Sequence, residues 1–209
     1  MKITIVAASA LAYASIATAV PAAVNAEVQP YELDPRSAGW SNKWWSRKRP
    51  QKDIFDFTST YYVTATPDQV IATNQTAVPG QAGAVGYYYF GINSHLDTIC
   101  YNITLVGIQG NYQSPAKTAT HIHEAACGRA GPPRLAFPNP VADANNANIR
   151  RSAGCLTGPF TTGIQVNNTA GTDTGNGFKV AQIEANPAGF FADVHTAGNT
   201  QGAVRGQLA

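Results

Sequence analysis

The stretch Tyr61-Tyr62-Val63-Thr64-Ala65-Thr66-Pro67-Asp68 sets the pattern for most of this chain. Its first five residues combine aromatic and β-branched side chains, which favour extended strands, and its last three form a turn signal. Short runs of the same kind predict further strands at 84–92, 98–108, 118–124, 178–184, 189–195 and 202–208. Clusters of Gly, Pro and Asn separate these runs and predict turns and loops.

Helices are almost absent from this pattern. Only Ala142 to Arg151 is expected to form a short helix, and no long stretch repeats apolar residues with the helical period of about 3.6. Many short strands at near-regular spacing favour antiparallel sheets. We therefore predict an all-β domain over residues 53–209, either an antiparallel Greek-key barrel or an immunoglobulin-like sandwich.

The first 26 residues resemble an export signal. Met1-Lys2 supplies a positive charge, residues 3–20 are apolar or small, and Val24-Asn25-Ala26 is a small-residue cleavage site. Cleavage is expected after Ala26, with Ala19 as the alternative. Pro21 and the small residues before it argue against a membrane anchor, and no other stretch predicts a transmembrane segment. The mature protein is expected to be secreted, and to be extracellular or associated with the cell wall.

Residues 27–52 form an N-terminal arm or linker of different composition. It holds all three tryptophans, Trp40, Trp44 and Trp45, and ends in Arg47-Lys48-Arg49-Pro50. The arm either docks on the domain or forms an aromatic and basic patch for a glycan or an acidic polymer. The formal net charge of +2 is too small to indicate a nucleic-acid partner.

Export would allow the cysteines to form a disulfide and three Asn-X-Thr sequons to be glycosylated. Three cysteines in an oxidising compartment predict one disulfide and one free thiol. Cys127 and Cys155 stand in Gly-rich, loop-like surroundings, so this pair is favoured, with Cys100–Cys155 as the alternative. The sequons, which are glycosylated only on a eukaryotic secretory route, begin at Asn74, Asn102 and Asn167.

Four stretches in order carry a family likeness. They are 83–87 (GAVGY), 99–104 (ICYNIT), 120–124 (THIHE) and 186–208, which opens with NPAGFFADVHT and closes with GAVRGQL. Together they resemble the CHRD domain, the module named after chordin, over residues 81–209, in its fungal secreted form. The resemblance implies an extracellular β-barrel or immunoglobulin-like sandwich of largely unassigned function.

A more distant likeness lies inside the first. His121-Ile122-His123-Glu124, followed by Cys127 and by Ala130-Gly131-Pro132, is similar to the copper-site stretch of copper–zinc superoxide dismutases. In that family a further histidine follows the Gly-Pro, where this chain has Pro133-Arg134. This likeness implies shared architecture more than shared catalysis.

The histidines of the domain are the candidate metal ligands. Residues i and i+2 of a strand point to the same face, so His121 and His123 can converge on one copper or zinc ion. The family pattern brings His195 beside this pair, whereas His95 lies in a loop-like stretch. The competing interpretation is structural, with neutral imidazoles bonded to backbone, to Glu124 or to Asp193. Asp193 is also a candidate ion-pair partner of Arg205.

Known catalytic motifs are absent from the sequence. It contains no G-x-S-x-G, no H-E-x-x-H and no phosphate-binding loop. This favours an extracellular binding module without catalysis over an enzyme, with a polysaccharide, the matrix or a secreted protein as partner. The alternative is a copper- or zinc-binding β-barrel whose histidine site is redox active.

Overall fold

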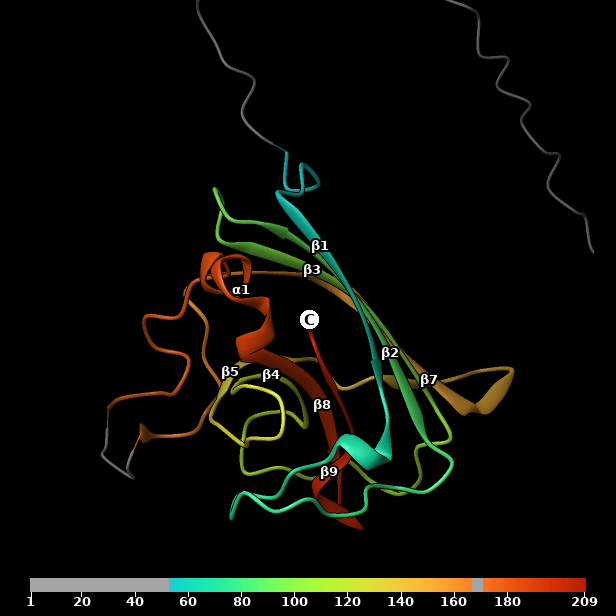
Figure 1. Cartoon of the computed structure of the whole chain (residues 1–209). Helices are drawn as coiled ribbons and strands as arrows, with labels where there is room; N and C mark the ends of the chain where they lie inside the picture. Colours follow the sequence, from blue (N-terminus) through green and yellow to red (C-terminus); the bar gives the residue numbers. More distant parts are fainter. Residues whose placement is uncertain (1–52, 167–170) are drawn as a thin grey trace, which may run out of the picture. The chain divides into compact units, whose positions relative to one another are not determined.

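Two antiparallel sheets form the fold, as the computed structural model shows for residues 53–166 and 171–209 (Figure 1). The predicted signal peptide, the N-terminal arm and Asn167 lie outside these described residues. The five-stranded sheet has the strand order β1-β2-β3-β7-β6. Its strands are β1 (Ser59–Ala65), β2 (Val85–Asn93), β3 (Thr98–Val106), β7 (Asn146–Thr157) and β6 (Val141–Asp143).

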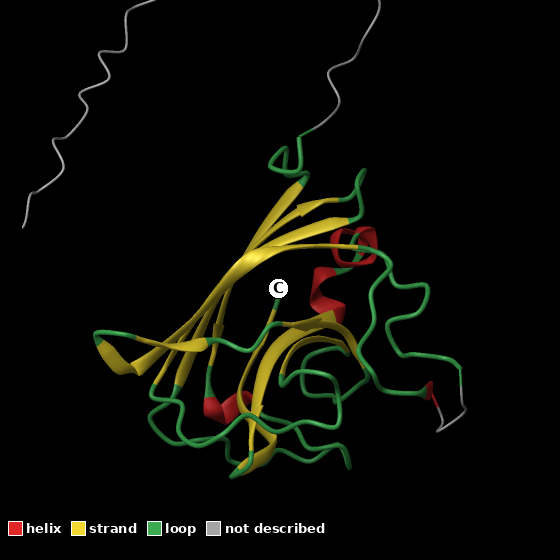
Figure 2. Ribbon diagram, turned by 180° about the vertical axis from the view of Figure 1, so that it is seen from behind, coloured by secondary structure: helices red, strands yellow, loops and turns green. Residues whose placement is uncertain are grey.

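The four-stranded sheet has the order β5-β4-β8-β9. Its strands are β4 (Thr120–Glu124), β5 (Pro133–Phe137), β8 (Phe190–Thr196) and β9 (Asn199–Gln207). The helical elements are short: α1 (Ala181–Ala185), η2 (Pro67–Gln69) and η4 (Pro187–Gly189). Helix α1 lies at one end of the space between the sheets (Figure 2). The prediction of an all-β sandwich is confirmed.

Alternation along the strands builds the core between the two sheets. On β3, Ile99, Ile103 and Leu105 are fully buried, while Asn102 between them is exposed. Across the sandwich, Phe137 of β5 stacks on Phe90 of β2 with ring centroids 5.6 Å apart. Since each sheet turns one set of alternate residues inward, the other set is available for a site.

The sheets meet along one edge. The chain beyond β1 pairs with β9 through two hydrogen bonds: Thr66 N donates to Arg205 O at 2.8 Å, and Arg205 N donates to Thr66 O at 3.1 Å. This antiparallel bridge joins the five-stranded to the four-stranded sheet. The sandwich is therefore partly closed in the manner of a barrel.

Two local predictions were wrong. Residues 142–151 form the β6–β7 hairpin instead of a helix, because Asp143 Oδ1 accepts a hydrogen bond from Asn145 N and starts a turn. Residues 178–184, expected as a strand, instead contain most of α1. Ile183 on that helix is buried against the core, so its apolar character reflects helix packing.

The favoured disulfide was also wrong. Cys100 on β3 and Cys155 on β7 are register partners and form the disulfide, whereas Cys127 is a free, exposed thiol. Cys100 alternates with Ile99 and Tyr101 and therefore points to the outer face of the sheet, not into the core. The loop-like Gly154 belongs to β7, which brings Cys155 opposite Cys100.

Candidate metal centre

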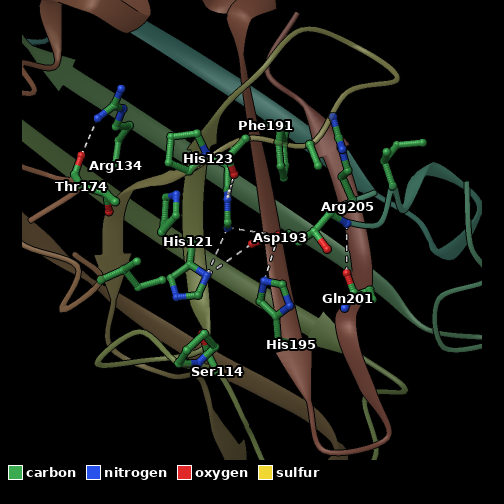
Figure 3. Close-up of a pocket in the computed structure, with 18 of the residues that line it drawn as sticks. Ser114, His121, His123, Arg134, Thr174, Phe191, Asp193, His195, Gln201 and Arg205 are labelled. Atoms are coloured by element: carbon green, nitrogen blue, oxygen red, sulfur yellow. Dashed lines mark hydrogen bonds and ion pairs between the residues drawn. The ribbon is translucent and has the colours of Figure 1, made fainter. Parts of the chain in front are cut away.

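Four side chains gather on the outer face of the four-stranded sheet. Ile122 on β4 and Val194 on β8 are fully buried in the core, so the residues beside them turn outward. The ladder pairs His121 with Asp193. His123 lies two residues after His121 on β4, and His195 lies two residues after Asp193 on β8, so both are on the same face of the sheet. The structure thus brings together the three predicted histidines, with Asp193 among them (Figure 3).

The spacing of their ligand atoms suits one small cation. His121 Nδ1 lies 3.3 Å from His123 Nε2 and 3.6 Å from Asp193 Oδ1. Asp193 Oδ2 lies 3.4 Å from His123 Nε2 and 3.1 Å from His195 Nε2. Tetrahedral ligands bound at about 2.0–2.1 Å stand about 3.3 Å apart. These four distances are close to that value, and one ligand atom from each of the four residues lies within 4.8 Å of the others.

Backbone carbonyls orient all three imidazoles. Each ring uses its outward nitrogen to donate a hydrogen bond to a carbonyl oxygen, which cannot itself donate. The bonds run from His121 Nε2 to Thr118 O at 2.7 Å, from His123 Nδ1 to Gly131 O at 2.8 Å and from His195 Nδ1 to Thr200 O at 3.0 Å. This fixes the neutral tautomer in which each inward nitrogen keeps its lone pair, as metal-bound histidines require.

The centre of the cluster has acceptors and no donor when the imidazoles are neutral. The lone pairs of His121 Nδ1 and His123 Nε2 face each other, and the carboxylate beside them only accepts. Asp193 Oδ1 is buried without a hydrogen-bond partner. Buried acceptors of this kind are costly unless a proton or a cation satisfies them.

The electrostatics keep Asp193 and His121 in the forms that bind metal, whereas His195 holds its proton more tightly and an ion would have to displace it. Burial would raise the pKa of the Asp193 carboxyl, but His123 and His195 together hold it well below its ordinary value. Burial lowers the pKa of His121. For His195, burial acts in the same direction, but Asp193 outweighs it and the pKa is raised. At neutral pH the cluster therefore contains a carboxylate and a neutral His121, both ready to coordinate.

Gly131 allows its carbonyl to reach His123. A Cβ at this position would lie 2.0 Å from Glu124 O, so any side chain would collide with the backbone at the end of β4. Pro132 O accepts a hydrogen bond from Glu124 N at 3.0 Å and holds the loop there. The Gly-Pro pair of the sequence thus orients the ring of His123.

A cavity of about 770 Å³ lies over the cluster. The side chains of His123 and His195 are 12% and 13% exposed, whereas that of His121 is only 1% exposed. Loops that cover the outer face form mostly apolar walls, which include Ile71, Pro115, Pro132, Ile164 and Val166. An ion in the cluster would therefore be approached from this cavity, past His123 and His195.

Two predicted ion pairs of the region are formed differently. Arg205 is the register partner of Asp193, but its guanidinium lies 3.5 Å from the ring centroid of Phe191. His123 also stacks on Phe191, with ring centroids 4.8 Å apart. Glu124 pairs with Arg134 at 2.7 Å, not with a histidine. Asp193 therefore pairs with the three imidazoles and not with Arg205.

Asp173 holds the loop that forms one wall of the cavity. Its carboxylate accepts hydrogen bonds from Gly163 N and Gly175 N, each at 2.7 Å, and from Thr162 N at 2.9 Å. Burial would raise the pKa of Asp173, but these backbone donors hold it below its ordinary value. The carboxylate is thus the anchor for the segment that carries Ile164.

Replacing this anchor by Asp173→Asn should lower the free energy of unfolding at pH 7 by about 1.5–3 kcal/mol, the range for hydrogen bonds to a charged group. Because the folded-state pKa is depressed, the carboxylate stabilises the fold above its ordinary pKa of about 3.9 and loses this effect as the pH falls through the folded value. Urea unfolding at pH 7 and near pH 3 should show a gap between variant and native protein that closes in acid. A gap of equal size at both pH values would contradict this role.

Sequence reasoning missed Asp193 as a candidate ligand. The pattern that could have identified it is Asp193-Val194-His195, which repeats the i, i+2 spacing of the H-x-H pair on the neighbouring strand. The exposed His95 lies in the loop between β2 and β3, away from the cluster. Asn74 is exposed in the loop before β2, and Asn102 is exposed on β3.

Comparison with known proteins gives one clear result. A family model described as the CHRD domain matches residues 67–208, so the match begins earlier than the likeness noted in the sequence. No curated protein and no solved structure matches the chain. Among the described residues, no helix is long and apolar enough to cross a membrane.

Proposed function

Because the chain belongs to the CHRD-domain family, we propose that it is an exported binding module whose domain holds a divalent transition-metal ion, zinc in the first place. The ligands of this ion are His121, His123, His195 and Asp193. Export rests on the signal-like residues 1–26 and is compatible with the Cys100–Cys155 disulfide. Binding, rather than turnover, is the proposed activity, with the ion as the constant ligand.

The orientation of the imidazoles carries this proposal. All three outward ring nitrogens donate to backbone carbonyls, so all three inward nitrogens present lone pairs toward one carboxylate. A purely structural cluster of neutral histidines would be expected to contain a donor for each buried acceptor. In this proposal a cation, and not a proton on one of the imidazoles, satisfies these acceptors.

Zinc fits the donor set better than its competitors. Imidazole and carboxylate ligands suit zinc and copper(II), but copper(II) prefers a tetragonal arrangement, while zinc accepts the near-tetrahedral one. The cavity beside the ion leaves access for an external ligand, such as a group of an extracellular polysaccharide, the matrix or a secreted protein. Copper in the same ligands would add redox chemistry, which makes it the second candidate.

Metal titration of the purified mature protein tests the proposal. After removal of metal with a chelator, the protein should take up one equivalent of zinc at neutral pH in a calorimetric titration. Free zinc at about 100 times its Kd should raise Tm by about 5–10 °C, because the ion binds the folded state only. Copper(II) titrated in parallel compares the two ions directly.

The fourth histidine provides the matched control. His95 is exposed and outside the cluster, so His95→Ala should keep the stoichiometry and the affinity. A metal-free protein that takes up neither zinc nor copper at neutral pH would refute the site and leave its histidines as structural residues.

A further inference from the structure

The outer face of the five-stranded sheet carries a pair of exposed aromatic rings, on the side of the sandwich away from the metal cluster. Tyr62 on β1 and Tyr89 on β2 are register partners. Their ring centroids lie 4.6 Å apart, and each residue is 54% exposed. The two rings are tilted by 41° to each other, and their exposed surfaces form an aromatic platform that another partly apolar group can contact.

The same cross-strand row continues to an asparagine. Tyr89 pairs with Asn102 on β3, which is exposed and begins the sequon Asn102-Ile103-Thr104. Side chains directly opposite each other in an antiparallel ladder have Cβ atoms about 4.5–5.5 Å apart. A group attached to the Asn102 amide therefore starts within reach of the tyrosine rings.

A groove of about 480 Å³ runs beside this row. Gly91 and Cys100 line it, together with Tyr89 and Asn102. Phe57 packs directly over Gly91, where a Cβ would lie 2.5 Å from its ring. The ring of Phe57 thus takes the place of a side chain at Gly91, and the groove next to Asn102 has an aromatic lining from Phe57, Tyr62 and Tyr89.

We propose that Asn102 carries an N-linked glycan whose first N-acetylglucosamine lies in this groove against Tyr62 and Tyr89. The donor is an oligosaccharide linked to a lipid diphosphate in a eukaryotic secretory pathway. Asn102 Nδ2 forms a bond to C1 of the first sugar and loses a proton, while the bond from C1 to the lipid diphosphate breaks and the diphosphate leaves. The inference rests on export and is independent of the metal site.

The covalent linkage to Asn102 favours the attached sugar over a free one as the occupant of the platform. The C–H face of a pyranose stacks on the electron-rich face of an aromatic ring, but one such contact alone gives a Kd weaker than about 1 mM. A sugar held by a short linkage has an effective concentration in the millimolar range or above. The sugar on Asn102 is therefore the preferred occupant.

Asn74 offers a matched comparison. It is also an exposed sequon asparagine, but its amide oxygen accepts hydrogen bonds from Thr76 in a polar turn. Its nearest chain neighbours, Thr73 and Gln75, are polar as well. A glycan there would extend into solvent without an aromatic platform and should not stabilise the fold.

The test uses the full chain secreted by a yeast host. Mass spectrometry after enzymatic deglycosylation in heavy-oxygen water should identify Asn102 as occupied. Trimming the glycan to a single N-acetylglucosamine should leave Tm about 2–4 °C above that of Asn102→Gln, the shift expected for one stacking contact in a domain of this size. In the Asn102→Gln variant, enzymatic removal of a glycan from Asn74 should shift Tm by less than about 1 °C, because the aspartate left behind keeps an oxygen for the Thr76 hydrogen bonds.

The tyrosines are then removed to separate stacking from glycosylation itself. In a Tyr62→Ala, Tyr89→Ala background, the difference in Tm between the trimmed protein and Asn102→Gln should disappear. An unmodified Asn102 in the secreted chain would overturn the proposal. The proposal would also be overturned if the native background showed no difference in Tm, or if the difference persisted unchanged without the tyrosines.

Discussion

The double variant His121→Ala, His123→Ala is expected to bind zinc about 10⁴-fold or more weakly than the native protein. Four-ligand zinc sites bind with about 10–16 kcal/mol, so each ligand contributes about 2.5–4 kcal/mol, and two contribute about 5–8 kcal/mol. Both imidazoles are held in the binding tautomer by backbone carbonyls, so little of this energy is spent on ordering. Competition with a chromogenic chelator of known affinity measures the loss.

A second variant guards against misinterpretation, because His121 is buried and its removal also affects the fold. His195→Ala removes one partly exposed ligand and should weaken zinc binding by about 10²–10³-fold, while the near-ultraviolet circular dichroism stays that of the native protein. Native affinity for zinc in a folded His195→Ala and in the double variant would exclude these residues as ligands.

Replacing both bridged cysteines, by Cys100→Ser with Cys155→Ser, is expected to lower the free energy of unfolding by about 4 kcal/mol. The bridge closes a sequence separation of 55 residues, and the chain-entropy model gives about this value for a loop of that length. Since a small domain is stable by only about 5–15 kcal/mol, the loss should be visible as a large fall in the urea midpoint.

Cys127→Ser is the matched control for the disulfide. Cys127 is exposed and free, so this exchange should change the free energy of unfolding by less than about 0.5 kcal/mol. An equal fall in the urea midpoint for Cys127→Ser would indicate that Cys127 takes part in a bridge. That outcome would restore the pairing first expected from the sequence.

Local alternation in the sequence predicted part of the metal centre and could not predict the rest. The i, i+2 spacing of His121 and His123 matches the period of a strand, so a shared face could be predicted from the sequence. Asp193 was expected only as a hydrogen-bond or ion-pair partner, because His121 and His123 lie on a strand far away in the sequence. The carbonyl of Gly131 was not predictable, since its position depends on loop geometry and leaves no mark in side-chain chemistry.

The fold shows the same division between local and long-range information. The all-β class followed from many short runs of aromatic and β-branched residues, which few other folds share. Residues 142–151 were misjudged because alanine favours helices, whereas the long pairing of β7 with β3 imposes a strand. The Cys100–Cys155 disulfide was only the alternative expectation, because the surroundings of Cys127 and Cys155 are Gly-rich, whereas the pairing depends on the register of β3 with β7.

The pairing of β4 with β8 has a consequence for how reliably the chain can fold. All four ligand residues come from this one ladder, so a slip of one strand by a single residue would turn its ligands toward the core and expose Ile122 or Val194. Only the native alignment brings the four proposed ligands together. A bound ion would therefore stabilise the correct alignment of β4 and β8, which are far apart in the sequence. A misaligned molecule could be recognised because it would not retain metal.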